Sequence, residues 1–171
     1  EAIERAAGAV LGGRTPAVLA VPAGPRALGV AAYTSGLGPL LGHWLEFGLL
    51  EAPEDAAAVL ALHLAHGRRR AERLAAELAR ALDRLAAAGL HATVLKGAHT
   101  ARAYFPEPGT RPMADLDLAV WPREGDGGRA LEAAERALER AGYRVRKRQP
   151  RVERSEWLAP GSPDVPRSLE L

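Results

Sequence analysis

The chain contains no cysteine, which excludes disulfides, thiolate metal sites and cysteine nucleophiles. Aromatic residues make up only 5% of the sequence, so a hydrophobic core must be built mainly from Leu, Val and Ala. No uninterrupted apolar run approaches the ~20 residues that span a bilayer. The first residues also lack the basic and apolar regions of a signal peptide. We therefore expect a cytoplasmic protein with no membrane partner.

Lysine is scarce as well, and it occurs only at Lys96 and Lys147, although Lys and Arg together number 23. The formal net charge of +2 is too small to indicate a nucleic-acid partner. The 47% hydrophobic and 26% charged residues are typical of a soluble globular protein. Its 171 residues suffice for one domain, or for a small catalytic core with a helical extension. The chain begins without Met and ends inside an expected strand, as a piece of a longer protein would.

Helical patterns dominate the first half, and strands appear only in the second half. We expect helices over 39–50 and 54–88, after short helices and turns over 1–35. Strands are expected at 91–95, 116–120, 143–146, 152–158 and 167–171, with helices at 98–104 and 129–141. This order predicts an α+β fold, with a helical N-terminal region over 1–88 and an α/β core over 89–171.

Two aspartates, Asp115 and Asp117, stand two positions apart beside and within an apolar run. Side chains at i and i+2 of a strand point to the same face, so the two carboxylates repel each other. At an effective dielectric of 20 and about 4 Å, the repulsion costs roughly 4 kcal/mol. A cation would relieve it, and paired oxygen ligands suit Mg²⁺, which usually works alongside substrate phosphates. The alternative is a solvated strand edge with salt bridges to Arg.

Several motifs occur in order around this acid pair. They are Val94-Leu95-Lys96-Gly97-Ala98, Tyr104, Arg111-Pro112-Met113, Asp115-Leu116-Asp117-Leu118, Val120 and Ala141-Gly142-Tyr143. By these motifs, residues 70–171 resemble the uncharacterised nucleotidyltransferase family, which belongs to the polymerase-β-like nucleotidyltransferase superfamily. The resemblance implies a nucleotidyltransferase-like mixed β-sheet with flanking helices. The N-terminal third carries no motif of this kind.

The resemblance implies transfer of a nucleoside monophosphate from a nucleoside triphosphate such as ATP to an acceptor, with Mg²⁺ as the cofactor. Asp115 and Asp117 match the two catalytic metal ligands that the superfamily places on one strand. Glu170 is the best match for the third catalytic acid and metal ligand, and Asp164 is the fallback. One of the acids would also act as the base. The sequence does not reveal the acceptor, which in this superfamily is a small molecule, a protein or a nucleic acid.

Lys96 and Gly97 stand where the superfamily usually has Gly-Ser. Backbone N–H groups at a helix N-terminus bind phosphate, and Gly allows a close approach, so this turn is a candidate nucleotide-binding site. Lys96 would reach the triphosphate as a point charge. The alternative is an ordinary strand-to-helix turn. Arg111 precedes the acid pair and either holds phosphate or pairs with Asp115.

Two other functions stay open on this sequence. The Ser hydroxyl is absent and the third acid depends on Glu170, which also fits a degenerate member that binds nucleotide or a partner without turnover. The basic residues 68–70 and Arg73 also fit a nucleic-acid-binding module. The interleaved Glu72 and Glu77 instead favour a solvated helix face for this cluster.

Overall fold

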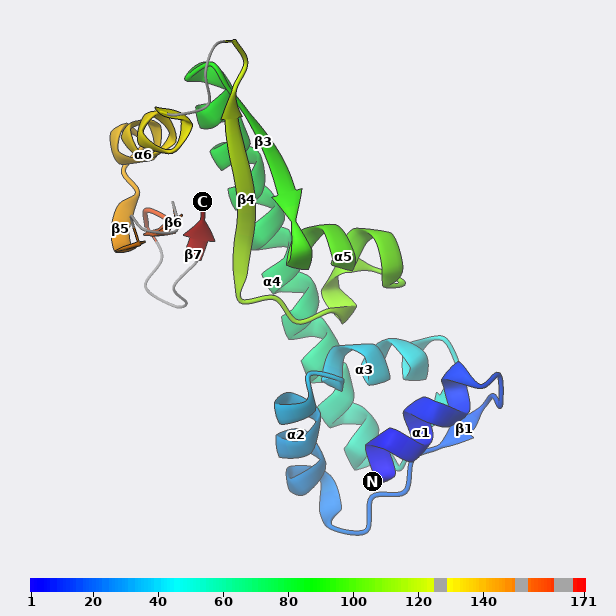
Figure 1. Cartoon of the computed structure of the whole chain (residues 1–171). Helices are drawn as coiled ribbons and strands as arrows, with labels where there is room; N and C mark the ends of the chain where they lie inside the picture. Colours follow the sequence, from blue (N-terminus) through cyan, green and yellow to red (C-terminus); the bar gives the residue numbers. More distant parts are fainter. Residues whose placement is uncertain (125–128, 150–153, 162–167) are drawn as a thin grey trace. The chain divides into compact units, whose positions relative to one another are not determined.

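The computed structural model describes residues 1–124, 129–149, 154–161 and 168–171, and it forms two compact units (Figure 1). The helical unit comprises Glu1–Ala71 and Tyr104–Pro112, and the sheet unit comprises Glu72–Ala103 and Met113–Leu171. One long helix, α4 (Glu54–Ala87), contributes its first part to the helical unit and its last part to the sheet unit. The division into a helical N-terminal region over 1–88 and an α/β core over 89–171 stays a prediction.

The helical unit is built from short elements around the first part of α4. These are α1 (Ala2–Leu11), β1 (Ala17–Val18), α2 (Gly24–Ser35), α3 (Gly38–Glu46), β2 (Leu50–Glu51) and the 3₁₀ helix η1 (Pro108–Thr110). Strands β1 and β2 pair in parallel, and this two-stranded ribbon was not expected from the sequence. The core includes Leu28, Leu41, Trp44 and Leu60, which come from three different helices. Burial of these side chains, rather than helix propensity alone, stabilises such short helices.

Gly67 allows the segment over residues 104–112 to lie directly against α4. A Cβ atom built on Gly67 would clash with the carbonyl oxygen of Gly109. Gly109 in turn approaches the backbone of Arg68 so closely that its own Cβ would lie 2.9 Å from the Arg68 Cα. Helix α4 continues through Gly67 without a break. The residue is small because another backbone passes there.

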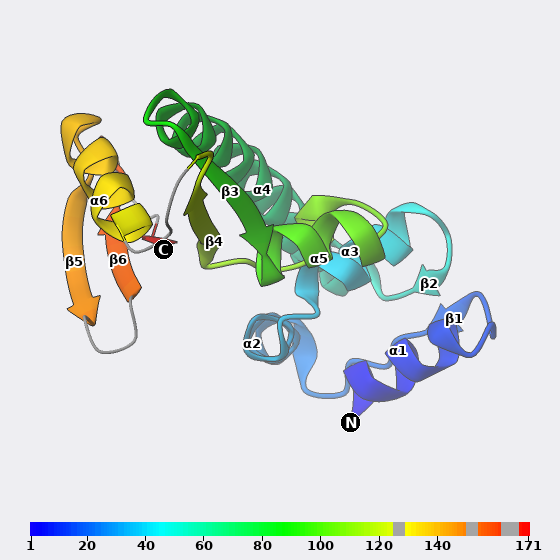
Figure 2. The same ribbon diagram turned by 45° about the horizontal axis from the view of Figure 1, so that its top comes forward.

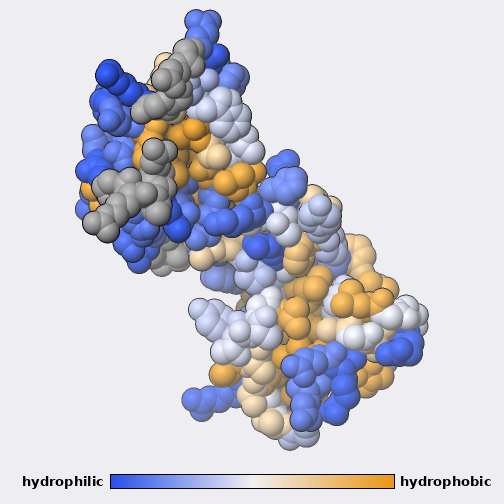
Figure 3. Space-filling view, viewed as in Figure 1, coloured by the Kyte–Doolittle hydropathy of each residue, from blue (hydrophilic) through white to orange (hydrophobic). Residues whose placement is uncertain are grey.

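Several large apolar side chains of the helical unit are exposed, among them Leu11, Tyr33, Phe47 and Leu62. Figure 3, viewed as in Figure 1, shows orange hydrophobic areas interspersed with hydrophilic ones on the unit that carries α1, α2 and α3. Such side chains are common on protein surfaces and need no partner to explain them. In the described part of the chain, none of the helices combines the length and the apolar character needed to span a membrane.

The sheet unit contains a mixed five-stranded sheet in the order β3-β4-β7-β6-β5. Its elements are β3 (Leu90–Leu95), α5 (Lys96–Tyr104), β4 (Asp115–Pro122), α6 (Ala130–Arg140), β5 (Arg144–Gln149), β6 (Arg154–Leu158) and β7 (Ser168–Glu170). Strands β4 and β7 pair in parallel, and the other neighbours are antiparallel. The expected α+β fold, with its mixed sheet and helical N-terminal region, is confirmed.

One face of this sheet is buried against α4 and α6, as both Figure 1 and Figure 2 show. Leu118, Trp157 and Leu169 from three strands pack with Leu85 of α4 and Leu138 of α6. Because side chains alternate between the two faces of a strand, burial of Leu116 and Leu118 directs Asp115 and Asp117 to the opposite face. The apolar core therefore fixes the face on which the acid pair lies.

Glu77 corrects one expectation about α4. The sequence indicated that Glu77 lies on a solvated helix face, but only 2% of this residue is exposed. Its carboxylate accepts hydrogen bonds from the hydroxyl of Tyr143 and from Arg80, whose Nη2 lies 2.6 Å from Oε2. The prediction was wrong because Tyr143, which lies 66 positions away, covers this side of the helix. Burial of a carboxylate is tolerated where it is paired and hydrogen-bonded.

Candidate functional site

The acid pair lies at the beginning of strand β4, where Asp115 is the first residue and Asp117 the third. Asp115 is half-buried and Asp117 is buried, because β4 has β3 on one side and β7 on the other. Two residues of a strand span about 6.6 Å, so the two backbones are close enough for the carboxylates to share one ion. The expected strand began at residue 116, and the observed strand includes both acids.

Glu170 lies beside this pair on the neighbouring strand. The parallel pairing of β4 with β7 makes Asp117 and Glu170 Cα partners. Paired strands are about 4.8 Å apart, and partner residues point to the same face. The structure thus brings Asp115, Asp117 and Glu170 together on one face, although Glu170 is 53 positions from Asp117 in the sequence. The fallback acid, Asp164, lies outside the described residues.

A further acid on this face was missed by the sequence reasoning. Glu156 of β6 is the Cα partner of Glu170, so it also points to the face of the acid pair. Its carboxylate accepts a 2.7 Å hydrogen bond from Arg146. The sequence could have placed Glu156 on one face of a strand, because residues 154, 156 and 158 alternate with the buried Ser155 and Trp157. Only the strand order shows that this strand lies next to β7. We call Asp115, Asp117, Glu156 and Glu170 together the carboxylate face.

Basic side chains neutralise part of the carboxylate face. The Lys96 ammonium Nζ lies 3.3 Å from Oδ1 of Asp117, and Arg154 forms an ion pair with Glu170. Within the described ranges, the carboxylate of Asp115 has no hydrogen-bond or ion-pair partner. The side chains of Asp115, Asp117 and Glu170 offer carboxylate oxygens, which are the ligands that hard cations such as Mg²⁺ prefer. The donor set therefore fits a magnesium ion between Asp115, Asp117 and Glu170.

Lys96 and Gly97 stand at the junction of β3 and α5. Antiparallel pairing of β3 with β4 makes Leu95 the Cα partner of Asp117, so the chain enters α5 right beside the buried acid. Lys96 has a φ of +37°, and no other non-glycine residue of the described ranges has a positive φ. Gly97 is buried in the first turn of α5. The candidate nucleotide-binding turn at Lys96 and Gly97 therefore lies next to the predicted metal ligands.

Arg111 belongs to the helical unit rather than to the sheet unit. It follows η1, and its Nη1 lies 3.4 Å from the carbonyl oxygen of Pro112, which is a weak contact. Its role with phosphate or with Asp115 stays a prediction.

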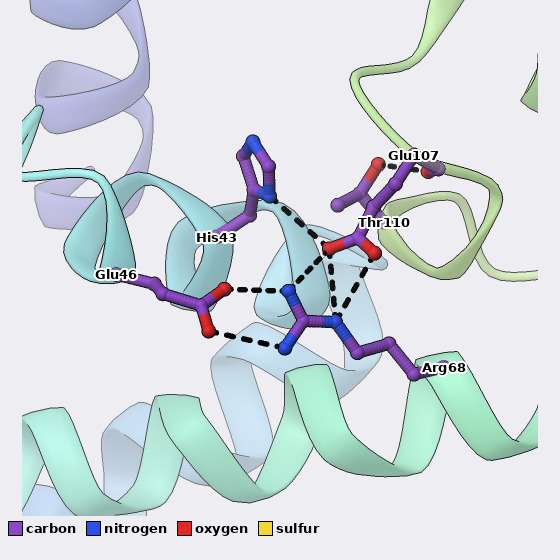
Figure 4. Close-up of polar contacts among 5 residues, drawn as sticks. All are labelled: His43, Glu46, Arg68, Glu107 and Thr110. Atoms are coloured by element: carbon purple, nitrogen blue, oxygen red, sulfur yellow. Dashed lines mark hydrogen bonds and ion pairs between the residues drawn. The ribbon is translucent and has the colours of Figure 1, made fainter.

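A second charged cluster lies in the helical unit, and we call it the Arg68 cluster (Figure 4). Arg68 of α4 donates hydrogen bonds of 2.8–3.1 Å to Glu107 and holds Glu46 of α3 with a contact of 2.5 Å. His43 Nδ1 lies 3.1 Å from Oε1 of Glu107. The hydroxyl of Thr110 donates a 2.7 Å hydrogen bond to the carbonyl oxygen of Glu107. The cluster fastens residues 104–112 to two helices.

The electrostatics of the Arg68 cluster follow from these contacts. Hydrogen bonds from Arg68 hold the pKa of Glu107 and the pKa of Glu46 below their usual range, and desolvation opposes both shifts. Hydrogen bonding to Glu46 and Glu107 raises the pKa of Arg68. His43, Glu46 and Glu107 carry potential ligand atoms within 4.8 Å of one another, but Arg68 already neutralises both acids. The cluster is a structural ion-pair network, and its acids were missed because they are remote in sequence.

Comparison with known families supports the resemblance and extends it. Residues 24–167 match the family model described as "Uncharacterised nucleotidyltransferase". The match begins at α2, so it includes α2, α3 and the first part of α4, which carry none of the motifs quoted above. Comparisons with curated proteins and with solved structures found no match. Because the family match spans most of the chain, this protein belongs to the uncharacterised nucleotidyltransferase family.

Proposed function

We propose that this chain is a metal-dependent nucleotidyltransferase. It would move a nucleoside monophosphate from a nucleoside triphosphate, such as ATP, to an acceptor that is a small molecule, a protein or a nucleic acid. Family membership supports the class of reaction. A cytoplasmic location belongs to the same proposal, since the reaction consumes nucleoside triphosphates.

The observation that carries the proposal is the pairing of β4 with β7. It makes Glu170 the Cα partner of Asp117, and Asp115 shares the same face. Three carboxylates on one face are costly unless a cation is present, because like charges at short range repel one another. A family member that assembles them from two distant segments is well suited to hold Mg²⁺ against a substrate triphosphate.

The residues of the chain would divide the work between two substrates. Gly97 in the first turn of α5 would let the triphosphate approach backbone N–H groups, and Lys96 would neutralise phosphate charge. Asp115, Asp117 and Glu170 would hold Mg²⁺, which stabilises the charge that develops on the attacking and leaving oxygens. One of these carboxylates would accept the proton of the acceptor hydroxyl as the base.

The transfer step balances without a further reactant. The acceptor oxygen forms a bond to the α-phosphorus while the bond from that phosphorus to the bridging oxygen breaks. Pyrophosphate leaves with the electron pair of the broken bond, and the acceptor proton passes to the carboxylate and then to water. No oxidant or reductant is needed.

The test combines binding and product release. Purified protein is titrated with Mg²⁺ and labelled nucleoside triphosphates, and pyrophosphate is measured across a panel of acceptors. Asp117→Asn should lose metal-dependent nucleotide binding and pyrophosphate release. Asp83→Asn, at an exposed position of α4, serves as the matched control and should behave as the wild type. Identical binding of metal and nucleotide by the wild type and Asp117→Asn would rule out the site.

A binding protein without turnover is the second candidate. The Ser of the superfamily is replaced, and Lys96 and Arg154 already neutralise two of the acids. Asp117-dependent nucleotide binding with no pyrophosphate release from any acceptor would favour this candidate. The nucleic-acid module is not supported, because Arg68 of the proposed basic surface is bound by Glu46 and Glu107.

A further inference from the structure

The contact between Lys96 and Asp117 joins two side chains with very different surroundings. The Asp117 side chain is 9% exposed, while that of Lys96 is 67% exposed. Their charged atoms are 3.3 Å apart, which is a long contact for a charged hydrogen bond. A buried carboxylate needs a cation, but an exposed ammonium group loses little when it returns to water. The two partners therefore depend on this contact unequally.

The residue type at position 96 favours a movable cation. Of the 23 basic residues only two are lysines, and one of them stands beside the predicted metal ligand. Lys carries a compact charge on a flexible four-carbon stem, whereas Arg binds a carboxylate through a rigid planar fork. At Glu170 the basic partner is Arg154, so both kinds of contact occur on the carboxylate face. The lysine contact is the one that a metal ion can replace at lower cost.

The backbone at Lys96 points to a constraint on this residue. Its φ of +37° lies in the region that favours glycine, and such conformations cost energy that the surroundings must supply. A glycine would relieve that cost but would remove the ammonium group. Lys96 also stands directly before Gly97, where the triphosphate is proposed to bind. The Lys96 ammonium group is thus within reach of the buried Asp117 carboxylate and next to the candidate nucleotide-binding turn.

We propose that Lys96 is an exchangeable counter-ion of the site. Without metal its ammonium group neutralises Asp117, and when Mg²⁺ takes that carboxylate the ammonium group transfers its contact to the triphosphate. This inference rests on the proposed function, because it assumes that Asp117 binds metal. It follows that metal alone must compete with the Lys96 ammonium group for Asp117. When nucleotide binds together with metal, the ammonium group contacts the triphosphate instead, and this competition is removed.

The proposal predicts effects of opposite sign for a single substitution. In Lys96→Met, Mn²⁺ without nucleotide should bind roughly threefold to fivefold more tightly, since the exposed ammonium group no longer competes with the metal for Asp117. The same variant should bind a non-hydrolysable triphosphate, with Mn²⁺ present, roughly tenfold more weakly, since a charge-assisted contact to phosphate is lost. The first effect is measured by the electron paramagnetic resonance signal of free Mn²⁺ and the second by calorimetry.

Two further variants protect the test against a folding artefact. Lys96→Gly also removes the charge and suits the positive φ, so it should reproduce both effects in a well-folded protein. Lys147→Met is the matched control, because Lys147 is the other lysine and lies on β5, three strands from β4. The sheet places Lys147 about 14 Å from β4 and about 10 Å from β7, and both distances exceed the screening length of charges at physiological salt. Lys147→Met should therefore change neither affinity.

The outcomes separate this inference from the function on which it rests. If Mn²⁺ binding requires Asp117 but Lys96→Met and Lys96→Gly leave it unchanged or weaken it, Lys96 is not an exchangeable counter-ion. A role for Lys96 in folding alone would weaken both affinities together and would likewise overturn the inference. If no variant, including the wild type, shows Mn²⁺ binding that depends on Asp117, the proposed metal site itself is wrong.

Discussion

Each of the two units contains a cluster in which basic side chains meet carboxylates, and the two clusters are built differently. In the Arg68 cluster one guanidinium binds both Glu46 and Glu107 through several hydrogen bonds. On the carboxylate face one ammonium contacts Asp117 at a single 3.3 Å distance, and Asp115 has no partner among the described residues. The first cluster is neutralised and keeps its shape, whereas the second has carboxylate oxygens to offer to an ion.

The difference follows from what each basic residue can do. A planar guanidinium satisfies two carboxylates at once, which suits a permanent junction between α3, α4 and residues 104–112. At Asp117 the single lysine contact leaves oxygen lone pairs unused, which suits a carboxylate that is proposed to accept metal. What distinguishes a structural cluster of acids from a candidate metal site is thus how many carboxylate oxygens already have a basic partner, and not how many acids the cluster contains.

The sharpest way to break this comparison is to neutralise one acid in each cluster. Asp117→Asn should lower nucleotidyl transfer by at least about 100-fold, because the proposed metal ligand is lost, and it should leave the free energy of unfolding unchanged or raised. Glu107→Gln should lower the free energy of unfolding and leave transfer unchanged. Pyrophosphate release and urea denaturation measure the two quantities. A loss of transfer in Glu107→Gln, or a loss of stability alone in Asp117→Asn, would contradict the assignment of roles.

The next effect concerns the guanidinium of the Arg68 cluster. Arg68→Met should lower the free energy of unfolding by about 1–2 kcal/mol, the order expected for charged hydrogen bonds that water partly screens. Arg69→Met is the matched control at the neighbouring exposed position and should stay within about 0.5 kcal/mol of the wild type. Urea denaturation at neutral pH measures both. Equal effects of the two substitutions would show that Arg68 is an ordinary surface residue.

Low pH should remove the contribution that Arg68 makes to the free energy of unfolding. The pKa of Glu107 and that of Glu46 are lowered in the folded state by hydrogen bonds from Arg68. A lowered carboxyl pKa stabilises the folded state above the unfolded pKa of about 4.3, and this stability is lost as pH falls through the folded pKa. The wild type should therefore lose more stability than Arg68→Met between about pH 5 and about pH 3.

Urea denaturation midpoints of both proteins across this pH range test the prediction. The gap between them should shrink as the pH falls, while Arg69→Met should follow the wild type throughout. A gap that stays constant down to pH 3 would mean that Arg68 stabilises the helical unit by packing of its stem rather than by its charge.

The sequence predicted the strands and the acid pair because these depend on local patterns. Alternating apolar residues around Leu116 and Leu118 indicate both the strand and the face on which Asp115 and Asp117 lie. Pro53 before α4, the acids Glu54 and Asp55 in its first turn, and Gly89 after it, with a φ of +76°, likewise mark the ends of the helix. In each case the physical cause lies within a few residues of the feature.

Features that depend on strand order or on distant contacts were beyond the sequence. Glu156 reaches the carboxylate face only because β6 pairs with β7, and no local pattern reveals that pairing. Glu77 appeared solvated because Tyr143, which buries it, lies far along the chain. In the sequence, Glu107 stands between two prolines and has no charged neighbour that would indicate its role. Its partner Arg68 lies on α4, far away along the chain. Register and long-range packing decide such cases, whereas helix and strand periods do not.

The smallest predicted effect isolates the backbone of Lys96 from its charge. Because φ is +37° at this position, Lys96→Gly should have a free energy of unfolding about 0.5–1 kcal/mol higher than Lys96→Ala, although glycine usually destabilises helices. Both variants lack the ammonium group, so the difference between them contains no charge effect. Ala75→Gly, at an exposed interior position of α4, is the control of opposite sign and should cost about 1 kcal/mol. If Lys96→Ala is as stable as Lys96→Gly by urea denaturation, position 96 is unstrained, and the lysine there costs the fold nothing to keep.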